Sequence, residues 1–478
     1  MIDRRTMLAA GALTVAGGMT PDILAATRPA LDIRDFGAVG DGVTLATAAL
    51  QRAIDAAGPG RCVLVPAGQR FVIGPVKLAG GIELRIDGVL LASTDPQHYP
   101  DKAEGLLHAR GADRLTLSGS GTIDGRSPQF MDHYDAENEW YVPKPFRPRL
   151  LVLEDCADLV IRDLEIRQAP SWTIHLLGCR RVLVDRVRID NQLDVPNCDG
   201  IDPDHCQDVE IRNCHIRCGD DGIVIKTTRG GEHFGPSRNI HVHDCVLETQ
   251  DSGLKIGTET VQDIRDVVFE RCTIVNSCRG LCIQLRDAGN IFGIIFRDIR
   301  FTARHFSPPW WGRGEAISFT AIPRKPGAAL GSLHHVRVER VTGRAENSVR
   351  IEGSPQARAH DITLRWVDLT LGRWTRYPGG IFDNRPTEAV EPLEPHDTPG
   401  FHIRHADLVS LDHCRLRWEA NPPAEFSHAV EVVDVTGLAM PGFVGTAAHD
   451  GQEAVAYSTM GAGGGIAAVT PPKQDLPA

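Results

Sequence analysis

The chain has 478 residues, of which 42% are hydrophobic and 24% charged, and these ordinary proportions exclude a disordered or collagen-like protein. Its 51 basic and 62 acidic side chains give a formal net charge of −11. Such a charge argues against an overall basic surface that would bind nucleic acid. We therefore expect a folded protein that could hold an anionic ligand only at a local cationic site.

The N-terminal segment has the features of an export signal. Arg4 and Arg5 precede an apolar stretch, residues 7–19, and small residues follow at Ala25 and Ala26. This order resembles a twin-arginine signal, although a frayed N-terminal helix is an alternative. No later apolar run reaches the roughly 18 residues of a membrane span. We predict that residues 1–26 are removed and that the mature protein is a soluble monomer, periplasmic or secreted, without membrane contact.

A repeat occupies most of the remaining chain. Segments that alternate apolar and polar residues begin at Cys156, Cys179, Cys206, Ser237, Ile264 and Ile291, at intervals of 23, 27, 31, 27 and 27 residues. A period near 27, with short strands in each repeat, predicts a right-handed parallel β-helix. Weaker copies on both sides extend this domain over residues 30–455. The Gly- and Ala-rich tail, residues 456–478, is expected to be poorly ordered.

A short helix is expected at the N-terminal end of the β-helix. Residues 47–57 carry a stripe formed by Leu50, Ala53 and Ile54. A helix with one apolar stripe can cover the otherwise open end of a solenoid.

The twelve cysteines lie mainly at apolar positions of the repeat. Stacked, buried, reduced thiols are the favoured interpretation, and one or two disulfides remain the alternative. Zinc is not expected, because no pair has the Cys-x-x-Cys spacing.

Four successive coils align on a glycine at residues 199–204, 221–226, 252–257 and 279–284. By the two-residue period of a strand, Ile223, Leu254 and Leu281 should point inward. The outward columns should then be Asp199, Asp221, Ser252 and Arg279; Asp202, Val224, Lys255 and Cys282; and Asp204, Lys226, Gly257 and Gln284.

This alignment brings several carboxylates together. Asp220 and Asp221 lie between two glycines, and Asp199 lies one coil earlier. Neighbouring carboxylates raise one another's pKa, so that one can stay protonated while another is ionised, as glycosidic-bond hydrolysis requires. The alternatives are that these aspartates form turns or hold a calcium ion.

Two motifs carry a resemblance to a known family. The sequence NCDGID at residues 197–202, followed by GDD at 219–221, resembles glycoside hydrolase family 28, the polygalacturonase-like enzymes. Residues 35–38 (DFGA), 147–150 (RPRL) and 169–175 (APSWTIH) fit it too. The resemblance covers roughly residues 30–440.

The resemblance implies roles for the aspartates. Asp220 looks like the general acid, with Asp199 and Asp221 activating the attacking water so that the anomeric configuration inverts, and Asp202 looks like a subsite residue. An inverting enzyme has its acid and base carboxyl groups about 6.5–9.5 Å apart. The implied substrate is a polysaccharide or oligosaccharide, and neither a cofactor nor a metal is expected.

The chain departs from the family at two motifs. Asp251-Ser252-Gly253 replaces Gly-His-Gly, and Cys282-Ile283-Gln284 replaces Arg-Ile-Lys. The substrate-binding candidates are Asn197, Asp202, Lys226, Ser252, Lys255, Arg279 and Gln284. The family resemblance would place an arginine at the position of Cys282, whereas here the cation is Lys255, one coil earlier in the chain. We therefore expect weak or no activity on plain polygalacturonate. Lys255 either contacts the substrate or only lowers the pKa of Asp221.

Two other functions fit a β-helix. A polysaccharide lyase would use calcium and a basic side chain, for which Lys255 and Arg279 are candidates, and a noncatalytic glycan-binding adhesin would need no clustered carboxylates. Long excursions near residues 124–147 and 302–332 could wall off the groove and favour exo action. Trp310 and Trp311 in the second excursion could stack on a sugar or anchor the loop.

Overall fold

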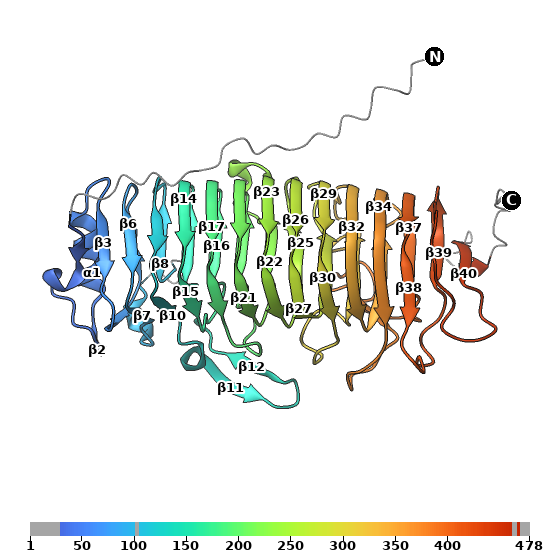
Figure 1. Cartoon of the computed structure of the whole chain (residues 1–478), viewed down its shortest axis with the longest axis horizontal. Helices are drawn as coiled ribbons and strands as arrows, with labels where there is room; N and C mark the ends of the chain where they lie inside the picture. The colour runs from blue at the N-terminus through green and yellow to red at the C-terminus, as the bar shows by residue number, and fades with distance from the viewer. Residues whose placement is uncertain (1–28, 101–104, 461–465, 469–478) are drawn as a thin grey trace, which may run out of the picture.

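The computed structural model describes residues 29–100, 105–460 and 466–468. The predicted export signal lies outside these residues. The chain winds as a long parallel β-helix whose coils stack along the horizontal axis of Figure 1. Each full coil contributes three strands, and each strand pairs in parallel with its counterparts in the neighbouring coils. The predicted β-helix is confirmed.

The first ladder of paired strands carries the regular repeat seen in the sequence. Its members are β1 (Leu31–Asp32), β3 (Cys62–Val65), β6 (Glu83–Ile86), β9 (Thr116–Ser118), β14 (Ala157–Arg162), β17 (Arg180–Asp185), β20 (Gln207–Arg212), β23 (Ser237–His243), β26 (Ile264–Glu270), β29 (Ile291–Arg297), β32 (Leu333–Ala345), β34 (Ala359–Leu371) and the second half of β37 (Phe401–Asp412).

The second ladder follows the first after a corner that is two residues long in the central coils. Its members are β2 (Asp41–Leu45), β4 (Arg70–Ile73), β7 (Val89–Ala92), β10 (Thr122–Asp124), β15 (Glu165–Arg167), β18 (Arg188–Asp190), β21 (His215–Cys218), β24 (Val246–Thr249), β27 (Thr273–Ser277), β30 (Arg300–Ala303), the second halves of β32 and β34, and β38 (Arg415–Trp418).

The third ladder positions the candidate site. Its members are β5 (Val76–Lys77), β8 (Leu107–Arg110), β13 (Leu151–Glu154), β16 (Ile174–Leu177), β19 (Ile201–Asp204), β22 (Ile223–Thr227), β25 (Ser252–Thr260), β28 (Arg279–Leu285), β31 (Glu315–Ala321), β33 (Asn347–Glu352), the first half of β37, β39 (Val430–Thr436) and β40 (Val455–Met460).

The interior is built from side chains that stack in register along the third ladder. Ile223 pairs with Leu254, Leu254 with Leu281, and Leu281 with Ile317, and all four are fully buried in the main hydrophobic core. The predicted inward column is therefore confirmed. Each coil buries the apolar face of the next, which a single coil could not do alone.

The ends of the solenoid differ from the central coils. Helix α1 (Thr47–Ala56) covers the N-terminal end, at the blue end of Figure 1, and buries Leu50, Ala53 and Ile54 as predicted. The predicted tail begins inside a strand, because β40 adds a further rung and β41 (Ile466–Ala468) pairs with it antiparallel. The described residues include no helix with the length and apolar character of a membrane span.

Excursions leave the coil between strands. One forms the hairpin of β11 (Met131–Asp135) and β12 (Trp140–Pro143), which projects below the solenoid in Figure 1. Another forms the hairpin of β35 (Ile381–Asp383) and β36 (Leu393–Pro395). Short 3₁₀ helices are η1 (Ile33–Phe36), η2 (Pro96–His98), η3 (Ser127–Phe130) and η4 (Glu232–Phe234). All twelve cysteines are free thiols, and eleven are buried, which agrees with the favoured interpretation.

Candidate active site

A cavity of about 340 Å³ opens on the outer face of the third ladder, at the low end of the range for small-ligand pockets. Its floor comes from the coils of β19, β22 and β25, and its walls come from the excursions predicted near residues 124–147 and 302–332. The lining residues are Trp140, Pro143, Trp172, Pro196, Asn197, Asp199, Asp220, Asp221, Lys226, Asp251, Lys255, Gly257, Thr258, Glu259, Pro309, Trp310 and Trp311.

The three predicted catalytic aspartates meet at this floor. The Gly200 amide donates a hydrogen bond of 2.9 Å to the Asp221 carbonyl, so Asp199 and Asp221 occupy the same position in adjacent coils. The glycine is required by this close approach, because a Cβ at Gly200 would lie 2.3 Å from the Gly222 carbonyl oxygen. One carboxylate oxygen from each of Asp199, Asp220 and Asp221 lies within 4.8 Å of the others.

Asp220 has the environment of a general acid. Burial, with the charges of Asp199 and Asp221, raises its pKa to about 7. Its two oxygens accept hydrogen bonds from the backbone amides of Asn197 (3.0 Å) and Asp221 (2.9 Å), which hold the carboxyl group in place. A pKa near neutrality lets this group hold a proton and release it during the reaction.

The two lysines of the site contact the other two aspartates. Lys255 Nζ lies 2.7 Å from Asp221 Oδ2, and both side chains are almost fully buried. Lys226 Nζ is shared between Asp199 Oδ2 (3.2 Å) and Asp202 Oδ1 (3.0 Å). One ammonium group cannot balance two buried carboxyl groups, so burial raises the pKa of Asp199 well above its usual value and that of Asp202 to about 6. Asp221, in contrast, has Lys255 as an ammonium partner of its own.

The predicted separation of 6.5–9.5 Å between acid and base is wrong, because these oxygens approach within 4.8 Å. Asp220 and Asp221 are neighbours in the chain, and Asp199 lies one coil away, so the stacking of the coils dictates short distances. Spacing of about 5 Å is typical of retaining enzymes. The geometry alone therefore does not support inversion.

Two further candidates lie below the cavity floor. Asp202 is fully buried and faces Lys226, and Ser252 is fully buried and donates a hydrogen bond of 2.9 Å to Asp251 Oδ1. Neither lines the cavity, so the expected direct contact of these residues with a substrate does not match their positions. Asn197 does line the cavity, at its rim.

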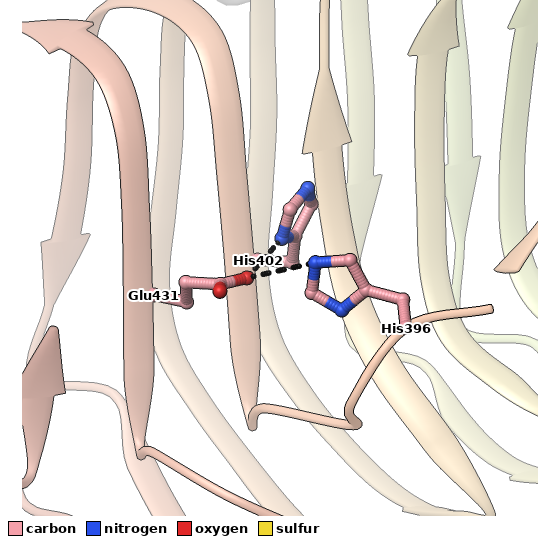
Figure 2. A group of neighbouring side chains, drawn as sticks. All are labelled: His396, His402 and Glu431. Carbon is pink, nitrogen blue, oxygen red and sulfur yellow. Dashed lines mark hydrogen bonds and ion pairs between the residues drawn. The ribbon is translucent and has the colours of Figure 1, made fainter. Parts of the chain in front are cut away.

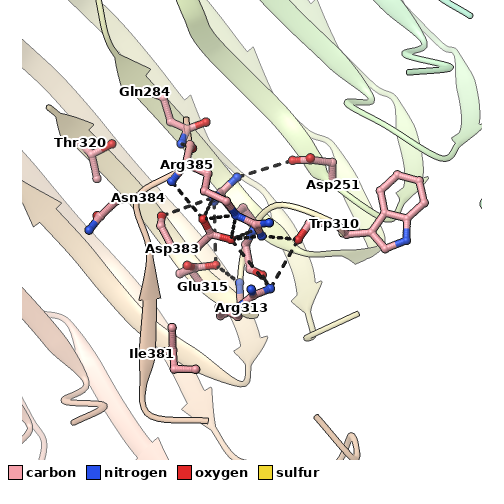
Figure 3. Close-up of polar contacts among 12 residues, drawn as sticks. Asp251, Gln284, Trp310, Arg313, Glu315, Thr320, Ile381, Asp383, Asn384 and Arg385 are labelled. Atoms are coloured by element: carbon pink, nitrogen blue, oxygen red, sulfur yellow. Dashed lines mark hydrogen bonds and ion pairs between the residues drawn. The ribbon is translucent and has the colours of Figure 1, made fainter. Parts of the chain in front are cut away.

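Arg279 and Gln284 are covered by the β35–β36 excursion. The buried Arg279 lies 3.6 Å from Asp251 and 3.9 Å from both Glu315 and Asp383, a cluster drawn in Figure 3. Gln284 Nε2 donates a hydrogen bond of 3.0 Å to the Arg385 carbonyl. These side chains bind the protein itself, which corrects their predicted role as substrate ligands.

The predicted outward column is only partly exposed to the cavity. Lys255 lines it, but Val224 and Cys282 are fully buried and do not. The register of the prediction is right, since Val224 pairs with Lys255 and Lys255 with Cys282. The error is in assuming that an outward side chain on a solenoid is open to a groove.

Sequence reasoning missed Asp251 as a site residue. Asp251 lines the cavity, and burial, with the charge of Asp221, raises its pKa to about 8. Its position in the tripeptide that replaces Gly-His-Gly was the available signal, because that tripeptide stacks on the Asp221 coil.

Four tryptophans line the cavity: Trp140, Trp172, Trp310 and Trp311. Trp172 has Lys226 Nζ 4.0 Å from its ring centroid. Trp140 meets Trp310 edge to face, with ring centroids 6.0 Å apart. Trp310 is buried against Cys278 and Phe306, so it anchors its loop and lines the cavity at the same time. No repeat register could have placed Trp140, which comes from an excursion.

The chain matches the family described as "Glycosyl hydrolases family 28" over residues 60–377. It is 30% identical over 280 residues to a probable polygalacturonase of Vitis vinifera, a match that covers 52% of this chain and 56% of that protein. The chain therefore spans just over half the length of this relative.

Solved structures show the same fold. An exopolygalacturonase from Thermotoga maritima superimposes with a TM-score of 0.61 at 24% identity, over 72% of this chain and 88% of that one. A family 28 exopolygalacturonase from Yersinia enterocolitica gives 0.62 at 18% identity, over 87% and 78%. Because the family match spans two thirds of the chain and includes all three clustered aspartates, the chain belongs to glycosyl hydrolases family 28.

Proposed function

We propose that this protein is an exported enzyme that hydrolyses glycosidic bonds in a pectin-like polysaccharide or oligosaccharide. The observation that carries the proposal is Asp220, a carboxyl group with a pKa of about 7 at the floor of a cavity and close to two other carboxylates. The twin-arginine-type N-terminus supports export, and the family supports hydrolysis.

The proposed reaction needs an acid and a base. Asp220 protonates the leaving glycosidic oxygen as its bond to the anomeric carbon breaks. Asp221, assisted by Asp199, takes a proton from a water molecule whose oxygen forms the new bond at the anomeric carbon. One water is consumed, and the cycle closes when Asp221 releases the proton that it took to solvent and Asp220 regains one from solvent. We propose inversion, the outcome implied by the resemblance. Because the short carboxylate spacing is typical of retaining enzymes, the anomeric configuration of the product tests this proposal.

We further propose that the sugar at the cleaved linkage is not plain galacturonate. The described residues that line the cavity include five carboxyl groups but only two ammonium groups, Lys226 and Lys255. Each ammonium group already contacts a buried aspartate. A uronate would therefore bring a further negative charge to a site that has no spare cation among these residues.

Exo action is a second part of the proposal. The excursions around residues 131–143 and 309–311 wall the cavity, and the β35–β36 excursion covers the outer face of β28 next to it. A groove that is obstructed beyond the cleavage point favours release from a chain end over cleavage in mid-chain.

A panel of pectic oligosaccharides and polysaccharides tests these proposals. We expect new reducing ends from a substrate with a neutral or substituted residue at the cleaved linkage, one product size from the start of the digest, and little action on polygalacturonate. Ultraviolet absorbance from an unsaturated uronate would indicate a lyase instead. Binding without any product would indicate an adhesin, and rapid hydrolysis of polygalacturonate would defeat the specificity proposal.

A further inference from the structure

A second polar cluster lies on the third ladder, away from the catalytic cavity. His402 on β37 pairs directly with Glu431 on β39, so their side chains stack in adjacent coils. His396 reaches them from the excursion that follows β36 (Figure 2). The cluster therefore joins an excursion to the body of the solenoid.

The three side chains converge on one carboxylate oxygen. His402 Nδ1 lies 2.6 Å and His396 Nε2 lies 3.3 Å from Glu431 Oε2, and Figure 2 shows both rings turned toward that oxygen. One donor atom from each residue lies within 4.8 Å of the other two. His402 is fully buried, whereas the side chains of His396 and Glu431 are 15% and 23% exposed, so the cluster is reachable from solvent on one side.

If both histidines are neutral, the hydrogen bonds to the Glu431 carboxylate cannot both form. His396 Nδ1 lies 2.5 Å from the Asp397 carbonyl, which can only accept, so Nδ1 carries the hydrogen. A neutral His396 then presents the lone pair of Nε2 to the carboxylate oxygen, and two acceptors face each other. A positive charge between them, either a second proton on the ring or a metal ion, removes the conflict.

A neutral His402 also leaves one ring nitrogen without a suitable partner, whichever nitrogen carries the hydrogen. If Nδ1 donates to Glu431, the buried Nε2 keeps a lone pair with no hydrogen-bond partner among the described residues. If Nε2 carries the hydrogen instead, the lone pair of Nδ1 faces Glu431.

We propose that His396, His402 and Glu431 form a binding site for one zinc-type divalent metal ion. Two imidazole nitrogens and one carboxylate oxygen, with an open position toward solvent, form a ligand set that Zn²⁺ commonly takes in proteins. The hydrogen bond from His396 Nδ1 to a backbone carbonyl is the outer contact that usually orients a metal-bound histidine.

The metal would pin the β35–β36 excursion to the solenoid. Phe382 on β35 stacks on the His396 ring with centroids 4.4 Å apart, and it lies 4.9 Å from His402. The next residues of this excursion, Asp383 to Arg385, cover Arg279 and Gln284 beside the catalytic cavity. The proposal concerns metal binding alone and does not depend on the proposed hydrolase activity.

Calorimetric titration of ZnCl₂ into the full-length, tag-free protein, after removal of metals with EDTA, tests the site near pH 7.5. We expect one equivalent of tightly bound zinc and a zinc-dependent rise in melting temperature. His396→Ala and Glu431→Gln should each weaken binding at least tenfold. His335→Ala is the matched control, because His335 is exposed and its ring contacts two other histidines, His334 and His360.

Melting curves in EDTA show whether each variant is folded. If one variant does not fold, the zinc-dependent rise in the melting temperature of the wild type still shows whether the protein binds zinc. The proposal is overturned if the wild type binds no zinc, if His396→Ala binds as tightly as the wild type, or if His335→Ala is the variant that loses binding. The first of these results would assign the positive charge to a doubly protonated His396.

Discussion

Two regions at the outer face of the third ladder bury carboxyl groups, and they hold these groups in opposite protonation states. At the catalytic floor, burial raises the pKa of Asp220 to about 7 and that of Asp251 to about 8. In the β35–β36 excursion, Asp383 is also buried, yet the hydrogen bond from Arg385 and the charge of Arg279 outweigh burial and lower its pKa to about 2.

The two regions differ in how many cationic side chains approach each buried carboxyl group. Arg279, Arg313 and Arg385 all approach Asp383, the last at 2.5 Å (Figure 3). At the catalytic floor one lysine serves two carboxyl groups, and Asp220 has hydrogen bonds only from backbone amides. Burial of acids thus produces a rigid ion-pair cluster where cations are plentiful and proton-holding groups where they are scarce.

The largest expected effect is the loss of activity in Asp220→Asn. Removal of a general acid costs about 10²- to 10⁴-fold in kcat, and we expect Asp199→Asn and Asp221→Asn to be comparably damaging. Steady-state kinetics on the substrate found in the panel measures this. The exposed Asp208→Asn serves as the control and should keep full activity. Full activity in Asp220→Asn would refute its role as the acid.

The ion-pair cluster should respond in stability instead. Arg279→Met leaves Glu315 and Asp383 with fewer buried partners, and breaking such a network costs about 3–5 kcal/mol. Urea unfolding measures the change. An unfolding free energy within 0.5 kcal/mol of the wild type, taken as roughly the scatter of neutral surface substitutions, would show that the cluster does not stabilise the fold.

Lys255→Met distinguishes the two roles considered for this lysine. Because Nζ lies 2.7 Å from Asp221 Oδ2, we expect a fall in kcat of about tenfold or more, a shifted pH profile and little change in KM. A rise in KM with kcat unchanged would instead assign Lys255 to substrate binding.

The smallest effect is a pH-dependent gain in stability for Asp220→Asn. The native pKa of about 7 lies above the usual 3.8, so the native state holds an extra proton at intermediate pH. The stability linked to that proton is present below pH 4 and is lost as the pH rises through 7. The variant should therefore be more stable than the wild type at pH 8 and equal to it near pH 4. A gain that is greatest at pH 4 would contradict this assignment.

Much of this architecture follows from the sequence. The alternation of apolar residues and the period near 27 predicted the coils, and the glycine alignment predicted which aspartates meet, because a ladder repeats one environment from coil to coil. The roles of Arg279 and Gln284 could not be predicted in this way. Both side chains are covered by residues about 100 positions away, in an excursion that no repeat register places.

The predicted distance between the acid and base carboxyl groups was wrong for a different reason. The general rule for inverting enzymes describes two carboxyl groups on opposite sides of a sugar, whereas here three lie on two adjacent coils, and coil stacking determines their spacing. Trp140 was missed because it reaches the cavity from a hairpin outside the solenoid.

Infrared difference spectroscopy of the wild type against Asp220→Asn tests the central claim most directly, because it needs no substrate. The carbonyl stretch of a protonated carboxyl group should be present in the wild type at pH 5, absent from the variant, and lost with a midpoint near pH 7. A midpoint near pH 4, the value of an ordinary aspartate, would contradict the account, because Asp220 would then hold no proton to donate at neutral pH.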